Sequence, residues 1–236
     1  MNGGVDLFEK IPTGVEGLDV MLKGGLIKGR TYLIKGGPGT GKTILSMHFL
    51  VEGAKRGENV VYITLEEPEN EVRENMETLG FDLSNVTIVD LSPTSGHPIF
   101  SSLMGFESGI DVKTFENILQ DIIGDNIDRV VIDSITMLKV ATPTETEYRA
   151  SLLRLMRTLK VKFNATTVLI SELGNGVEDY LVNGMIELRT IEVKGRAVRG
   201  IKIVKMRGSD FDETIRPYRI TNRGIEVYPD LSVFEV

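Results

Sequence analysis

The stretch GGPGTGKT, residues 36–43, decides how this chain folds. It matches the pattern G-x-x-x-x-G-K-[ST], in which Gly36, Gly41, Lys42 and Thr43 occupy the fixed positions. Glycines let consecutive backbone N–H groups turn toward an anion, where a side chain would block the approach. The apolar run TYLI lies just before the stretch, and the helical pattern KTILSMHFLVEGAK begins within it. These flanks favour a strand, a phosphate-binding loop and a helix over a chance glycine-rich turn.

The residue types of this loop predict how it holds a nucleotide. The residues expected to bind the phosphates of ATP or ADP are Gly36, Gly37, Pro38, Gly39, Thr40, Gly41, Lys42, Thr43 and Ile44. Lys42 reaches the β- and γ-phosphates and is expected to assist catalysis, while the Thr43 hydroxyl is a ligand for Mg²⁺. The first N–H groups of the following helix, and the positive end of its dipole, add to the attraction for phosphate.

The composition is typical of a soluble globular protein and excludes several kinds of site. Of the 236 residues, 41% are hydrophobic and 26% are charged. The absence of cysteine excludes disulfides, thiolate metal sites and cysteine nucleophiles. The first twenty residues lack the apolar core of a signal peptide, and no apolar run approaches the ~20 residues that span a bilayer. We therefore expect a cytoplasmic protein with no membrane contact.

The pattern along the chain predicts one α/β domain over residues 1–236, with a mainly parallel sheet covered by helices on both faces. Apolar runs rich in Val and Ile predict strands at 31–36, 59–66, 86–91, 129–134 and 166–172. Helical patterns lie between them at 42–55, 68–80, 112–126 and 144–163. Four further strands, 184–195, 197–208, 215–224 and 225–230, are joined by short turns and predict an antiparallel extension. Segment 92–109 is irregular and is either a functional loop or a surface segment.

Acidic residues at the ends of two predicted strands complete the expected site. Asp133 follows the apolar run RVVI and is expected to bind Mg²⁺ directly or through water. Glu66 and Glu67 end the strand VVYITL, at the edge where parallel sheets bind ligands, and one of them is expected to activate water. On an extended strand only one of the two would face the phosphates, unless the chain bends before Pro68. The alternative is that both belong to the first turn of the following helix, which favours acids.

Four other polar residues have less defined expectations. Ser171 ends the strand TTVLIS beside the site, where it either senses the γ-phosphate or caps a turn, and Glu172 follows it. His48 lies inside the helix after the loop, where packing is the simpler role. His97 has no partner at a metal-ligand spacing.

Taken in order, these motifs resemble the RecA superfamily of ATPases and, more closely, its KaiC-like branch. Residues 13–43 are similar to the family's opening, and VVYITLEEP (60–68) is similar to a KaiC segment that ends in two catalytic glutamates. GVEDYLVNGMIELR (176–189) and residues 203–229 are similar to its late strands. The resemblance covers nearly the whole chain and extends to single-domain archaeal members described as RadA paralogues. It implies a RecA-like fold and a ring, commonly a homohexamer, with ATP bound between subunits.

In such a ring, Lys205 and Arg207 of the segment KMRG would reach the nucleotide of the neighbouring subunit. A cation supplied across an interface stabilises charge on the transferring phosphoryl group. The chain departs from the family pattern at two places, of which the first bears on the contact with the base or ribose across the interface and the second on phosphorylation. Phe211 stands where the family often has a nucleotide-contacting histidine, and Asp179 and Tyr180 align with the Ser/Thr pair that the clock protein phosphorylates. A clock-type autokinase cycle is therefore not expected.

Three functions compete on these grounds. The first is a ring-forming ATPase that hydrolyses ATP to ADP and phosphate and uses the reaction to change its shape or its protein partners. The second is a RadA-paralogue accessory protein that binds single-stranded DNA, which needs basic or aromatic loops. The net charge of −7 and the absence of Lys and Arg from 92–109 count against it, although 189–208 is rich in both. The third is a nucleotide sensor that does not hydrolyse ATP.

Overall fold

The computed structural model describes residues 8–96, 126–140, 142–172, 174 and 176–234, together with residues 117, 118, 120, 121 and 124. Residues 97–109 of the expected irregular segment, including His97, lie outside the described residues. Most of the expected helix 112–126 does so as well. No helix among the described residues is long and apolar enough to cross a bilayer.

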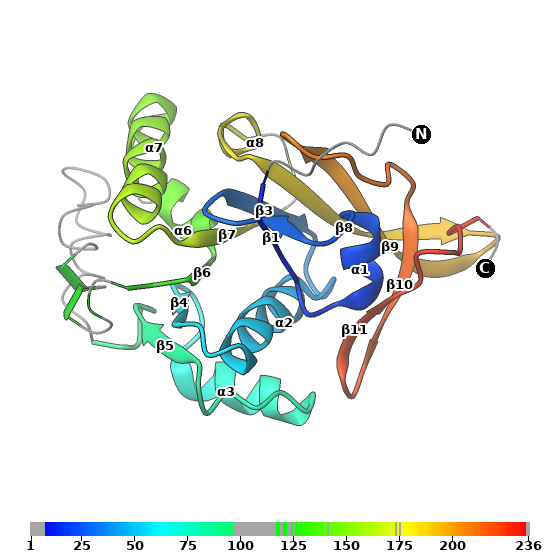
Figure 1. Cartoon of the computed structure of the whole chain (residues 1–236), viewed down its shortest axis with the longest axis horizontal. Coiled ribbons are helices and arrows are strands. Elements are labelled where there is room, and N and C mark those ends of the chain that lie inside the picture. The colour runs from blue at the N-terminus through cyan, green and yellow to red at the C-terminus, as the bar shows by residue number, and fades with distance from the viewer. Residues whose placement is uncertain are drawn as a thin grey trace.

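A nine-stranded sheet organises the fold, in the order β11-β10-β9-β8-β3-β7-β6-β4-β5 (Figure 1). Its strands are β3 (Thr31–Gly36), β4 (Val60–Thr64), β5 (Thr87–Asp90), β6 (Arg129–Asp133), β7 (Thr166–Ser171), β8 (Gly184–Val193), β9 (Arg196–Met206), β10 (Arg216–Thr221) and β11 (Gly224–Val227). The strands from β8 to β5 run parallel, whereas β9, β10 and β11 are added antiparallel to their neighbours. β8 is thus the strand at which the polarity of the sheet changes. A separate pair, β1 (Lys10–Ile11) and β2 (Leu26–Ile27), is antiparallel.

Helices cover both faces of the parallel part, as the continuous apolar strands predict. The helices are α1 (Glu16–Met21), α2 (Lys42–Lys55), α3 (Glu69–Thr78), α6 (Ile135–Val140), α7 (Glu145–Val161) and α8 (Glu178–Leu181). One core holds α1, α2 and α3, and a second core on the other face holds α6 and α7. Alternate residues of β3 serve the two cores, since Tyr32 and Ile34 belong to the first and Leu33 to the second. The expected α/β class, a mainly parallel sheet with helices on both faces and antiparallel C-terminal strands, is therefore confirmed.

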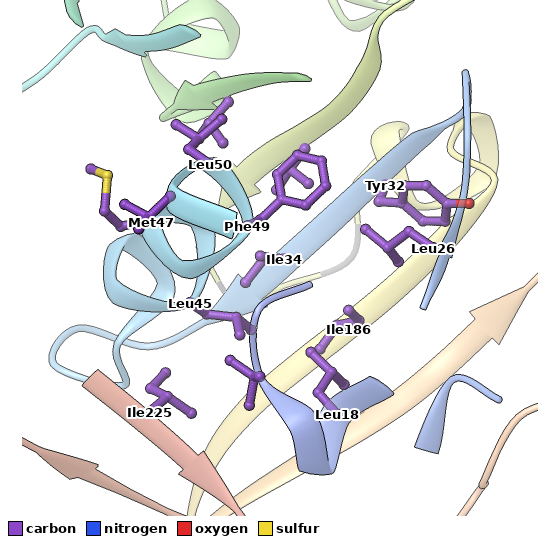
Figure 2. Close-up of a cluster of buried hydrophobic side chains, with 14 of the residues drawn as sticks. Leu18, Leu26, Tyr32, Ile34, Leu45, Met47, Phe49, Leu50, Ile186 and Ile225 are labelled. Carbon is purple, nitrogen blue, oxygen red and sulfur yellow. The ribbon is translucent and has the colours of Figure 1, made fainter. Parts of the chain in front are cut away.

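Most elements lie where the sequence predicts them. α2 and β3 have the predicted bounds. Figure 2 shows the α2 side chains Leu45 and Phe49 in one cluster with the sheet residues Ile34 and Ile186. In α7, Leu152, Leu155 and Leu159, which recur at helical spacing, are fully buried in the second core, and Met156 is partly buried against it. These contacts fix α2, and hence the loop before it, against the middle of the sheet.

A buried arginine at the start of β6, which the sequence pattern does not reveal, connects three segments of the first core. Arg129 begins β6 and is 0% exposed. Its guanidinium donates to the Glu58 carboxylate at 2.5 and 3.0 Å and to the Pro12 and Phe49 carbonyls at 2.7 and 2.9 Å. A Cβ on Gly53 would lie 2.6 Å from Arg129 Nε, so this position of α2 requires glycine. One cation thus ties the N-terminal segment and α2 to the sheet.

His48 joins α2 to the antiparallel extension, which confirms the expected packing role. Its Nε2 accepts a hydrogen bond of 2.8 Å from the Ile225 backbone N–H of β11. The ring meets Phe81 edge-on, with centroids 4.7 Å apart. Burial, together with the charge of Lys55, lowers the pKa of His48 from 6.5 to about 4. Because Nε2 must stay unprotonated to accept the bond, the contact needs neutral histidine.

This pKa predicts a specific acid sensitivity. The unfolded chain binds more protons than the folded chain between pH 6.5 and 4. The contribution of His48 to the free energy of unfolding is thus complete above pH 6.5 and is lost as the pH falls toward 4. At about 1.4 kcal/mol per pH unit, the loss reaches about 3 kcal/mol. His48→Gln retains an acceptor but does not titrate. In urea unfolding at pH 7 and pH 4.5, we expect the variant to lose less stability than the native chain, and equal losses would contradict this account.

Candidate functional site

The loop between β3 and α2 has the backbone conformation that a phosphate cradle needs. Gly39 and Gly41 have φ of +70° and +91°, in the left-handed region that favours glycine. A Cβ at Gly36 would lie 2.4 Å from Thr40 Oγ1, and one at Gly41 would lie 3.0 Å from Ile220 Cδ1. Backbone angle therefore requires glycine at position 39, close packing requires it at position 36, and both favour it at position 41.

Lys42 already lies over this loop. As the first residue of α2, it directs its Nζ to the Gly36 carbonyl at 2.9 Å and to the Gly37 carbonyl at 3.1 Å. Thr40 Oγ1 closes the turn with a bond of 2.8 Å to the Gly37 carbonyl. The side chain of Ile44 instead packs against the core, so any contact of this residue with phosphate would come from its backbone N–H.

The two expected metal ligands, Thr43 and Asp133, are in direct contact. Thr43 Oγ1 donates to Asp133 Oδ2 at 2.7 Å, and the Tyr62 hydroxyl donates to the same oxygen at 2.6 Å. Burial raises the pKa of the Asp133 carboxyl and the charge of Glu66 raises it further, whereas these two hydrogen bonds lower it. The end of β6 is aligned with the end of β4, where Thr64 pairs with Asp133. The first turn of α2 is thereby fastened to two neighbouring strands.

Glu66 and Glu67 both face this region, because the chain bends between β4 and α3. The strand ends at Thr64, whose Oγ1 donates to the Glu67 carbonyl at 2.5 Å. The Ser134 hydroxyl donates to Glu66 Oε1. Burial and then the charge of Asp133 raise the pKa of Glu67. Helix α3 begins only after Pro68, so the alternative that both acids belong to its first turn is wrong.

These groups surround one cavity of about 270 Å³. It is lined by Pro38, Gly39, Lys42, Thr43, Tyr62, Thr64, Glu66, Glu67, Asp133, Ser134 and Glu172. Tyr62, Thr64 and Ser134 were not among the predicted site residues. Thr64 and Ser134 lie at the carboxyl ends of β4 and β6, which was their only signal, whereas Tyr62 in the middle of β4 gave none. Ser171 is directed elsewhere, because its hydroxyl contacts Glu178 Oε1 at 3.4 Å.

Lys205 and Arg207 do not line this cavity. Lys205 Nζ donates to the Asp179 carbonyl at 2.5 Å, and Arg207 donates to the Tyr180 carbonyl at 2.9 Å. Burial and the nearby charge of Arg207 lower the pKa of Lys205. Phe211, which replaces the family's histidine, packs against the first core. Within one chain, the pair is thus held at α8 rather than at the loop.

Comparison with known proteins identifies the family. Residues 11–232 match the family model described as ATPase: KaiC. The chain is 34% identical to the UPF0273 protein PH0284 of Pyrococcus horikoshii over 95% of this chain and 96% of that one. It is 33% identical to the circadian clock protein KaiC3 of Synechocystis, over 98% of this chain and 48% of the clock protein.

A solved structure agrees with these relatives. The KaiC-like protein PH0186 of Pyrococcus horikoshii superposes with a TM-score of 0.78 at 29% identity, over 94% of this chain and 100% of that one. These relatives carry KaiC names or a neutral UPF0273 name, so the alternative of a RadA-paralogue accessory protein is not favoured. The fold, the loop and these likenesses agree that the chain belongs to the KaiC-like ATPases of the RecA superfamily, a family of ATP-binding proteins.

Proposed function

We propose that this chain is a Mg²⁺-dependent ATPase of the cytoplasm that works as a ring-shaped homo-oligomer, with nucleotide at the interfaces between subunits. The observation that carries the proposal is the 2.7 Å hydrogen bond between Thr43 Oγ1 and Asp133 Oδ2. A hydroxyl and a carboxylate, both ligands that suit Mg²⁺, meet there at the wall of a cavity that also receives Lys42. Thr43 and Asp133 would hold the ion, which supplies positive charge to the phosphate oxygens when bound.

The chain's own groups account for the hydrolytic step. The backbone N–H groups of residues 36, 37 and 39–44 and the ammonium of Lys42 bind the phosphates and fix the γ-phosphorus toward Glu66 and Glu67. One of these carboxylates accepts a proton from water as the water oxygen bonds to phosphorus and the bond to the ADP oxygen breaks. Burial raises the pKa of Glu67, which makes it a stronger base than an exposed glutamate. The products are ADP and phosphate.

A second cavity, of about 520 Å³, suits the base and ribose of the nucleotide. Tyr218, Arg219 and Ile220 of β10 contribute to its wall. Two of its residues also reach the loop, because the Tyr218 hydroxyl donates to the Thr40 carbonyl at 2.6 Å and Ile220 approaches Gly41. An apolar side chain beside polar groups is a surface on which a purine can lie.

The ring is proposed because Lys205 and Arg207 lie at α8 rather than at the phosphate cavity. A cation needed for turnover would then come from the neighbouring copy. Self-association fits the family, and a homohexamer is the form we propose. The net charge of −7 favours a protein partner over single-stranded DNA.

Lys42→Ala tests the loop. The substitution removes two charged hydrogen bonds to phosphate, each worth about 1.5–3 kcal/mol, so affinity for ATP should fall by about 100-fold or more. Lys28→Ala is the matched control, because Lys28 is exposed and paired with Glu9. We would measure both by calorimetric titration with Mg²⁺ and ATP. An unchanged affinity in Lys42→Ala would refute the loop assignment.

Replacing Glu66 and Glu67 together by Gln should lower kcat by about 10²–10⁴-fold and spare nucleotide binding, because a general base is lost while the phosphate contacts remain. The two single variants identify which carboxylate is the base. Glu69→Gln serves as control, since Glu69 pairs with Arg73 on α3. Phosphate release that continues undiminished in the double variant would remove both acids from the mechanism.

Mixing inactive subunits tests for sites shared between copies. Lys42→Ala disables a subunit's own loop, and Arg207→Ala disables the cation that it presents to its neighbour. In a 1:1 mixture, about a quarter of the interfaces combine an intact loop with an intact cation, so about a quarter of the native rate should return. Particle mass, measured in parallel, reports the ring itself. If mixed assemblies recover no activity, the sites are not shared.

A further inference from the structure

Lys35 is a buried lysine immediately before the phosphate loop. It is the last side chain of β3 ahead of Gly36, and it is only 4% exposed. Its Nζ donates to both carboxylate oxygens of Asp179, at 2.7 and 2.9 Å, and to the Gly174 carbonyl. A buried ammonium is stable only when it is paired, so this contact fixes α8 relative to the strand that carries the loop.

Helix α8 also binds the two cationic side chains that are expected to act on a neighbouring subunit. The Asp179 carbonyl accepts from Lys205, and the Tyr180 carbonyl accepts from Arg207. Asp179 therefore contacts Lys35 through its carboxylate and Lys205 through its backbone. Few covalent bonds separate the two contacts, so a shift of the carboxylate moves the carbonyl as well.

A second contact, beside the ion pair of Lys35 with Asp179, also joins α8 to the sheet. Ser171 is the partner of Lys35 in the pairing of β7 with β3. Its hydroxyl contacts the Glu178 carboxylate, which is 4% exposed. Adjacent residues of α8 are thus attached to adjacent strands, both of which end beside the nucleotide cavity. This arrangement leaves α8 little freedom to move independently of the loop.

We propose that the ion pair between Lys35 and Asp179 positions Lys205 and Arg207 for the neighbouring subunit's nucleotide. Lys35 is then a positioning residue that acts in trans, although it lies in the strand that leads into its own loop. This inference rests on the proposed function, because it requires cations shared between copies. It adds a link from each subunit's loop strand to the site that the subunit completes on its neighbour.

The test uses Lys35→Met, which keeps the length of the side chain and removes its charge. We expect the affinity for ATP to change by no more than about threefold and the particle mass to stay the same. The value of kcat should fall at least tenfold. Lys28→Met is the matched control, because its ion pair with Glu9 is exposed, and it should retain native kcat. A loss of ATP affinity with unchanged kcat would overturn the proposal.

Mixing experiments then separate action in trans from action on the chain's own loop. Lys35→Met mixed with Lys42→Ala should regain activity, because one subunit keeps its loop and the other keeps its positioned cations. Lys35→Met mixed with Arg207→Ala should regain none, because both lesions affect the presented cations. The opposite pattern would assign Lys35 to its own loop and overturn the proposal. If instead Arg207→Ala and Lys42→Ala fail to complement each other, the shared-site function itself fails.

The double variant Lys35→Met with Asp179→Asn guards against misfolding of the single variant. It removes both members of the pair with little change in volume, a replacement that buried ion pairs often tolerate. The inference predicts the same pattern of recovery as for Lys35→Met. A folded, assembled double variant with native kcat would show that the ion pair positions nothing that turnover needs.

Discussion

The candidate site depends on one carboxylate oxygen, which connects the start of α2 to two strands of the sheet. Asp133 Oδ2 accepts hydrogen bonds from Thr43 at the start of α2 and from Tyr62 on β4. Three elements that are far apart in the chain therefore meet at one atom, at the edge where the parallel strands end. The energetic cost of burying this carboxylate is offset by two short hydrogen bonds, and the same burial strengthens its attraction for a cation.

Much of the fold could be predicted because its signals are local. The glycine-rich loop lies between an apolar strand and an apolar-faced helix, and β3 and α2 have the predicted bounds. Continuous Val and Ile runs predicted the two-sided sheet, since a strand buried on both faces needs no polar alternation. The order of strands is not local in this sense, so the central place of β3 could not be read from the chain. The short turns after residue 184 did predict the antiparallel extension, but not that β8 would pair parallel with β3.

The site was predictable where a side chain follows a strand and unpredictable where a contact joins distant segments. Thr43 and Asp133 were expected at one site, and their contact is direct. The bend that brings Glu66 and Glu67 to one cavity depends on where β4 stops, which hydrophobic pattern defines only within a few residues. The pairing of Lys35 with Asp179 spans 144 residues and gives no signal in either segment alone. Arg129 is similar, because a charged residue at a strand end looks exposed until its partners are known.

The packing at Gly41 has a consequence for how such proteins are dissected by mutagenesis. Ile220 and Ile225 from the antiparallel extension press against the α-carbon of this glycine, within 3.0 and 3.2 Å of where a methyl would stand. An alanine there would wedge the extension away from the loop whether or not any nucleotide were present. A lesion at this position would therefore mix a folding defect with a ligand defect, and an inactive product would say little about phosphate recognition. The exchange of Lys42 leaves this packing intact, although it also removes the two hydrogen bonds that its Nζ donates to the loop carbonyls.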